Sequence, residues 1–285
     1  MRNQGRRLQH KGTILAGLLG VVALAASASG QASSLTGNSI PTAQIPENSQ
    51  QVRPVAVLLE LFTSEGCSSC PPADALLRAL AGRQMPSGQL LIGLSEHVTY
   101  WNNLGWTDPY SNELYTARQT SYSEKFNLGS VYTPQLIING SEQIVGSDRR
   151  GLARALAAEQ QHQKSQQTQL SIGTVRRTHD GIAITYTLSS LPSRSHAQLF
   201  AAVADDLDRS SVLRGENEGR TLNHSAVVRS LVEIGPALEG AGQQITLHLP
   251  AAHAASDTRQ HVVLFAQEAN FGSVLGVTEQ ALALP

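Results

Sequence analysis

Two cysteines separated by two residues are the part of this sequence best suited to chemistry. Cys67 and Cys70 are the chain's only cysteines and lie within the segment Cys-Ser-Ser-Cys-Pro-Pro. An apolar run of strand length, Val55 to Phe62, precedes them, and a helical pattern of apolar residues follows. Because a thiolate can attack a disulfide sulfur to form a mixed disulfide, the pair predicts thiol–disulfide exchange with another protein.

The residues around Cys70 place the pair at the start of the predicted helix. Two prolines directly after it fit a first turn, whose N–H groups have no intrahelical partner. Those N–H groups and the positive end of the helix dipole favour a thiolate, so we expect the pKa of Cys67 to lie below its free value. Glu65 and Asp74 oppose this shift through their charge. Cys67 is the expected nucleophile, and Cys70 would resolve the mixed disulfide.

The N-terminus indicates where this chemistry would take place. A basic start, an apolar segment from Thr13 to Ala26 and the small residues that follow are typical of a secretory signal peptide spanning residues 1–28. Residues 29–53, rich in Ser, Gln, Asn and Pro, are a predicted flexible tether. The apolar segment is shorter than the roughly 20 residues of a membrane helix, although an uncleaved anchor is the alternative. We expect an exported protein, periplasmic or extracellular, with no stable membrane span after signal cleavage; such a compartment favours disulfides.

The charge of the mature chain argues against one class of partner. The full chain has a formal net charge of -1, and residues 1–28 carry four basic and no acidic side chains, so their removal leaves -5. Nucleic acids are bound by clustered Lys and Arg. We therefore expect no nucleic-acid partner.

Two successive patterns predict two domains. Strands and helices alternate through residues 54–160, which predicts an α/β layer with helices on both sides of a sheet. A glutamine-rich linker at 161–168 follows. Residues 169–285 contain about seven short β-type runs separated by turns, a pattern typical of an antiparallel sandwich. The expected architecture is thus an α/β domain followed by an all-β sandwich-like domain.

The dipeptide Thr133-Pro134 strengthens the redox interpretation. It stands after a predicted helix, at the start of the third strand of the α/β pattern. An X–Pro bond there could be cis, and in this architecture its loop would pack against the thiols and shape the contact with substrate backbone. Zinc normally takes four ligands in a structural site, and the chain has no second cysteine pair. We expect no bound metal or cofactor.

These segments resemble the thioredoxin fold and, more specifically, the exported family called domain of unknown function 1223. The resemblance to the family covers about Val55 to Gly276 and is carried by Leu59–Asp74, His97–Trp101, Leu104–Pro109, Tyr132–Gln135, Gly215–Leu222, His224 and Val227–Arg229. It implies a thioredoxin-like fold for residues 54–160 and a location outside the cytoplasm. The family name leaves the reaction open.

Five further residues are candidates for substrate binding: His97, Trp101, Trp106, Arg220 and His224. The first three follow the second strand, at the end where such sheets place their sites; the alternative is that they belong to the core and a surface loop. The last two lie in an unusually polar run, which could reach across to the cysteines and stabilise a thiolate or bind an anionic partner. The alternative for that run is a solvated loop.

The sequence therefore predicts an exported thiol–disulfide oxidoreductase that acts on exported protein thiols or disulfides together with a redox partner. One alternative is a copper-binding or copper-delivery module that uses the two cysteines and His97, because thiolates favour Cu(I). The other is a redox-inert protein that binds a partner.

Overall fold

The computed structural model describes residues 55–163, 168–179, 181–248 and 258–283. This part of the chain contains three α-helices and eleven strands. The expected signal peptide and tether lie outside the described residues. The first half contains β1 (Ala56–Thr63), α1 (Pro71–Leu80), β2 (Leu90–His97), a 3-10 turn (Asn102–Leu104), α2 (Glu113–Lys125), β3 (Gln135–Ile138), β4 (Glu142–Val145) and α3 (Arg149–Gln163). The second half contains β5 (Gln169–Thr178), β6 (Gly181–Ser189), β7 (Gln198–Ser211), β8 (Thr221–Pro236), β9 (Gly240–Leu247), β10 (Gln260–Gln267) and β11 (Val274–Leu282).

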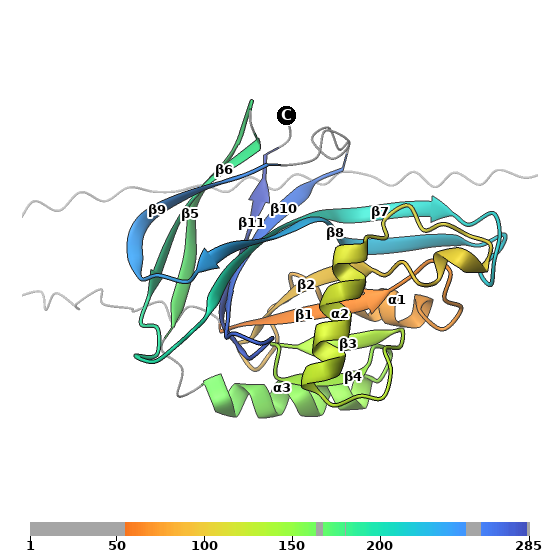
Figure 1. Ribbon diagram of the computed structural model, residues 1–285, viewed down its shortest axis with the longest axis horizontal. Helices are drawn as coiled ribbons and strands as arrows, with labels where there is room; N and C mark the ends of the chain where they lie inside the picture. Colours follow the sequence, from red (N-terminus) through yellow and green to blue (C-terminus); the bar gives the residue numbers. More distant parts are fainter. Residues whose placement is uncertain (1–54, 164–167, 180, 249–257, 284–285) are drawn as a thin grey trace, which may run out of the picture. The chain divides into compact units, whose positions relative to one another are not determined.

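Strands from both halves of the chain form one large sheet. Its eight strands have the order β11-β10-β7-β8-β2-β1-β3-β4, and a separate three-stranded sheet has the order β5-β6-β9 (Figure 1). The two halves join where β8 pairs in parallel with β2, at Ser95 and Val227. None of the described helices is long and apolar enough to cross a membrane.

The expected fold class, an α/β thioredoxin-like domain followed by an all-β sandwich, is therefore wrong. β7, β8, β10 and β11 continue the sheet that β1 to β4 begin, so the larger sheet is mixed and belongs to both halves. The physical reason lies in β2, whose residues from Leu91 to His97 are all buried. The apolar run from Leu90 to Leu94 indicates an interior strand, but it does not identify the distant strand that lies beside β2.

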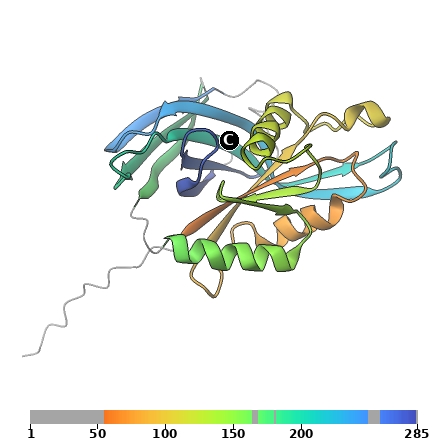
Figure 2. The ribbon, with the colours of Figure 1, turned by 60° about the horizontal axis from the view of Figure 1, so that its bottom comes forward.

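β1 is covered on both faces, which explains its continuous apolar sequence. One face, including Val57, Leu59 and Leu61, packs against α1 and α3 (Figure 2). On the other face Leu58 joins a cluster with residues of α2, β2, β7 and β10, among them Phe265. Because strands of the same sheet meet in this cluster, the sheet must curve.

The three-stranded sheet covers part of the large sheet. Ile182, Ile184 and Leu188 of β6 pack with Ala201 of β7 and Leu264 of β10 in a third cluster. The alternating burial along β6 fits a strand with one face in this core.

α2 is held in place by a buried ion pair rather than by a strong apolar face. The Nε atom of Arg118 donates to Oε1 of Glu60 on β1 at 2.6 Å, and one guanidinium nitrogen donates to Gln267 on β10 at 2.9 Å. The hydroxyl group of Tyr122, one turn further along α2, donates to the other Glu60 oxygen at 2.6 Å. These bonds pair a carboxylate that is completely buried.

α1 begins at the second cysteine. Cys70 is its N-cap and prolines occupy the first two helical positions. The helix ends before Gly82, which adopts a positive φ of 73° as a residue after a helix often does. This geometry fixes the cysteine pair at the junction between β1 and α1.

Replacement of Gly146 by alanine should destabilise the packing beside this junction. An added Cβ would lie 2.8 Å from Cδ1 of Leu61, 3.0 Å from Cβ of Ala73 and 3.1 Å from Cβ of Pro134. We expect Gly146→Ala to lower the free energy of unfolding by about 1–3 kcal/mol in chemical denaturation, as overpacking does. Gly129→Ala is the control, because its Cβ would meet nothing within 4 Å. Equal effects of the two substitutions would contradict the close packing at Gly146.

Candidate functional site

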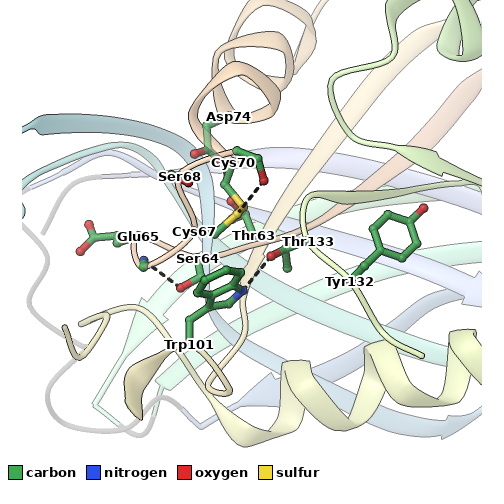
Figure 3. The surroundings of a disulfide bond; sticks show 12 residues. Thr63, Ser64, Glu65, Cys67, Ser68, Cys70, Asp74, Trp101, Tyr132 and Thr133 are labelled. Atoms are coloured by element: carbon green, nitrogen blue, oxygen red, sulfur yellow. Dashed lines mark hydrogen bonds between the residues drawn. A yellow bond between two sulfur atoms is a disulfide. The ribbon is translucent and has the colours of Figure 1, made fainter. Parts of the chain in front are cut away.

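Cys67 and Cys70 form a disulfide with their Cα atoms 5.4 Å apart (Figure 3). Both cysteines are completely buried, whereas Ser68 and Ser69 between them are exposed. The hydroxyl group of Ser69 lies 3.3 Å from Sγ of Cys67. The turn therefore reaches the surface while its sulfur atoms do not. In this oxidised state neither cysteine titrates, so the lowered pKa expected for Cys67 concerns the reduced protein and stays a prediction.

Thr133 and Pro134 lie near the turn and are joined by a cis peptide bond. The indole Nε1 of Trp101 donates to Oγ1 of Thr133 at 2.8 Å. A Cβ added at Gly66, the residue before the first cysteine, would be 3.0 Å from Cβ of Trp101. Figure 3 shows the indole next to the cysteine turn, with its nitrogen directed toward Thr133. Trp101 thus connects the two segments that the sequence singled out.

The loop Val212–Arg220, which joins β7 to β8, contacts the cysteine turn through Asn217. This side chain is completely buried, and its Nδ2 donates to the carbonyl oxygens of Glu65 at 2.8 Å and Cys67 at 3.0 Å. Its Oδ1 accepts a hydrogen bond from the guanidinium group of Arg220 at 2.7 Å. The polar run does reach across to the cysteines, and Arg220 orients the amide that makes the contact.

Glu216 in the same loop makes a second contact. Its Oε2 accepts a hydrogen bond from the backbone N–H of Ser68 at 3.0 Å. Hydrogen bonds from the side chain and backbone of Ser68 hold the pKa of Glu216 below its ordinary value. The exposed carboxylate of Glu216 therefore accepts a hydrogen bond from a backbone N–H group that lies between the two cysteines.

Two histidines and three carboxylates form a buried polar group that adjoins the turn: Glu65, Asp74, His97, Asp108 and His224. Nδ1 of His97 and Oδ2 of Asp108 are 2.7 Å apart. The same Asp108 oxygen accepts from the backbone N–H of Glu65 at 2.8 Å. The pair thereby attaches the end of β2 to the segment that leads into Cys67.

Glu65 connects this group to the second half of the chain. Trp106 donates its Nε1–H to Oε2 of Glu65 at 2.7 Å. The other carboxylate oxygen accepts from the hydroxyl group of Ser210 on β7 and lies 3.3 Å from Nε2 of His224 on β8. His224 also approaches Asp74 of α1, with 3.7 Å between Nδ1 and Oδ2. His224 thus lies between two buried carboxylates.

Burial and pairing shift the pKa values of this group in different directions. Burial by itself would lower the pKa of His97, but the charge and hydrogen bond of Asp108 outweigh it, so the pKa is raised. Burial would raise the pKa of Asp108, but His97 outweighs it and the pKa is lowered. For Asp74 burial is the larger effect, and its pKa is raised despite the charge of His224. The His97–Asp108 contact therefore favours the charged form of both groups, and it is an ion pair below the folded pKa of His97.

The structure brings all the site residues predicted from the sequence to this region, but some of them are buried and others are exposed. His97 and His224 are buried and contact carboxylates, whereas Trp101 and Trp106 are partly exposed and Arg220 is exposed. Sequence reasoning missed Asp108. The available signal was His97 itself, because an ionisable residue at the end of a buried strand needs a partner. Across the described ranges, no cluster of three or more His, Cys, Asp or Glu side chains is arranged to hold a metal ion.

Removal of the Asp108 charge should change how stability depends on pH. A raised His97 pKa stabilises the fold fully below about pH 6.5, and this contribution is lost as the pH rises through the folded value. The lowered pKa of Asp108 stabilises the fold above about pH 4. This contribution is lost as the pH falls through the folded pKa of Asp108. We expect Asp108→Asn to lower the free energy of unfolding more at pH 6 than at pH 9.

Denaturation at both pH values measures this difference. Asp148→Asn is the matched control, because Asp148 is exposed and bonds to backbone N–H groups of α3, which asparagine can also do. A loss of stability in Asp108→Asn that is the same at both pH values would contradict the ion pair.

Two solved structures resemble this chain over most of its length. A protein of Agrobacterium tumefaciens, determined by X-ray crystallography, has a TM-score of 0.57 and 27% sequence identity, with 79% of this chain and 93% of that chain covered. HBP35 of Porphyromonas gingivalis has a TM-score of 0.56 and 16% identity, with 81% of this chain and 77% of that chain covered, and shows similarity of fold alone. No curated protein matches the sequence.

A family model, described as a protein of unknown function (DUF1223), matches residues 58–267. The match begins within β1 and ends with β10, so it includes the disulfide, the buried polar group and the loop that contacts them. The chain belongs to the DUF1223 family.

Proposed function

We propose that this protein is exported and carries out thiol–disulfide exchange on other exported proteins through Cys67 and Cys70. The observation that carries the proposal is the disulfide between these residues at the N-terminus of α1. A thiolate released there would lie near the positive end of the helix dipole, which lowers the energy of the reduced, reactive state. The exposed Ser68 and Ser69 bring this turn to the surface, where a protein partner can approach it.

The reaction transfers two electrons in two steps. In the reduced protein the Cys67 thiolate attacks a substrate disulfide, forms a mixed disulfide and releases one substrate thiolate, which takes up a proton. The Cys70 thiolate then attacks Sγ of Cys67, breaks the mixed disulfide and releases the second substrate thiolate. The protein is left with the Cys67–Cys70 disulfide. A dithiol donor restores the reduced pair, so a redox partner is part of the cycle.

We assign substrate contact to Thr133 and Trp101, shaping of that contact to the buried Pro134, and positioning of the turn to the buried histidines. Thr133 and Trp101 are bonded to each other beside Cys67 and are partly exposed. His97 and His224 are completely or almost completely buried, so they act through Glu65 and its neighbours rather than by touching substrate.

A structural disulfide is the second candidate, because one specific observation favours it. Both cysteines have no exposed surface. A disulfide that stays buried cannot meet a substrate thiolate, and it would stabilise the fold by restricting the unfolded chain.

The reduction potential of the pair separates the two candidates. The potential is measured by equilibrating the protein with dithiothreitol or glutathione buffers and counting alkylated thiols by mass. We expect a value between about -120 and -270 mV, the span of known exchange proteins. A value below about -300 mV would identify a structural disulfide.

Replacement of Cys70 by serine should trap substrates. In Cys70→Ser the second step is blocked, so we expect mixed disulfides between Cys67 and exported proteins, visible by non-reducing electrophoresis of cell extracts. Cys67→Ser is the matched control and should trap fewer species, because the expected nucleophile is absent. A correctly folded Cys70→Ser protein with no trapped species would contradict the exchange mechanism.

A further inference from the structure

The loop Val212–Arg220 lies against the turn that holds the fully buried disulfide. Asn217 donates to the carbonyl oxygens of Glu65 and Cys67, and Glu216 accepts from the backbone N–H of Ser68. The two loop residues therefore bond to backbone groups before, at and after the first cysteine. We refer to Val212–Arg220 below as the covering loop.

The base of the covering loop is firmly attached, whereas its tip is not part of the strand pairing. β7 and β8 are paired as far as Ser211 and Thr221. Backbone bonds from Val212 to Arg220 and from Gly219 to Val212 close the base. The segment from 213 to 218 lies beyond these bonds, so its displacement would leave the ladder between β7 and β8 intact.

Two glycines give the tip its shape. Gly215 and Gly219 have positive φ values of 80° and 77°, a conformation that glycine adopts without steric cost. A Cβ added at Gly215 would lie 3.4 Å from Cβ of Trp106, whereas a Cβ at Gly219 would meet nothing within 4 Å. Gly215 thus lies within the tip and packs on the site, whereas Gly219 lies at the base of the loop in open space, where it can absorb a change in backbone angles.

The contacts that close the loop can be exchanged for contacts with water or with another chain. Glu216 is exposed, so its hydrogen bond to the backbone N–H of Ser68 competes directly with solvent. The carbonyl groups that Asn217 satisfies would be hydrated once the tip moves away. The N–H of Ser68, released by Glu216, would become a donor for a backbone carbonyl of an incoming polypeptide.

We propose that the covering loop is a gate, which holds the disulfide in an unreactive closed state and must open before a thiol can attack it. This inference rests on the proposed exchange function and names how that site is regulated. Asn217 is the closing residue, oriented by Arg220, and Glu216 occupies the backbone donor that a substrate would use. Attack of an external thiolate on Cys67 then forms one S–S bond and breaks the Cys67–Cys70 bond, and Cys70 leaves as a thiolate that takes up a proton.

The kinetics of reduction by dithiothreitol test the gate on the full mature chain. Opening before attack predicts that the observed rate constant reaches a plateau at high dithiothreitol concentration, where opening limits the reaction. We expect Asn217→Ala to raise the rate at low dithiothreitol by about tenfold or more, since the closed state loses two buried hydrogen bonds. Mass spectrometry of alkylated thiols follows the reaction.

Glu216→Ala provides a second variant in case Asn217→Ala folds poorly, because Glu216 is exposed. Its matched control is Glu218→Ala, which removes an exposed carboxylate from the same loop. We expect faster reduction for Glu216→Ala and an unchanged rate for Glu218→Ala. Rates that rise linearly with dithiothreitol and are the same in the wild type, Asn217→Ala and Glu216→Ala would overturn the gate.

The gate and the exchange function fail in different ways. A reduction potential in the exchange range together with unchanged rates in both variants would refute the gate and leave the function standing. A potential typical of structural disulfides together with faster reduction in the variants would refute the function and show that the loop shields an inert bond.

Discussion

The parallel pairing of β8 with β2 is the constraint on which the candidate site depends. It places the β7–β8 hairpin beside the end of β2, so that Ser210 and His224 meet Glu65, and the loop at the tip of the hairpin meets the cysteine turn. A hairpin attached elsewhere on the sheet would leave Glu65 and Asp74 buried without these partners, at a high cost in free energy. The joining of the two sheet halves and the contacts of the site therefore depend on the same strand pairing.

Buried charge explains why the site is built from so many segments. Each carboxylate of the polar group needs several donors, and no single strand or helix supplies them. Asp108 takes donors from His97 and from two backbone groups, while Glu65 takes them from a tryptophan, a serine and a histidine. The result is a turn whose backbone is fixed on several sides while its two serines remain exposed.

Local features of this fold could be predicted from the sequence, and the arrangement of its parts could not. Val55 to Phe62 predicted β1, and the two prolines after Cys70 were correctly expected in the first turn of α1. The neighbour of β2 depends on a contact between residues far apart in the chain, which periodicity does not reveal. The sequence placed Asn217 in a polar run. Its role could not be predicted, because it bonds to two backbone carbonyl groups, and every residue has such a group whatever its side chain. The types of the side chains were therefore enough to predict where the site lies, but its contacts with backbone groups could be seen only in the structure.

The separation between the disulfide and its covering loop has a consequence for biosynthesis. Ser68 and Glu216 lie 148 positions apart, so the ribosome completes the cysteine turn long before it makes the segment that covers it. A nascent chain that has not yet reached residue 212 therefore lacks the contacts that Glu216 and Asn217 make with the cysteine turn. The bond between Cys67 and Cys70 can form at that stage, before the hairpin docks. Both cysteines are buried in the finished fold, so an oxidant reaches the two thiols more easily before this loop is in place.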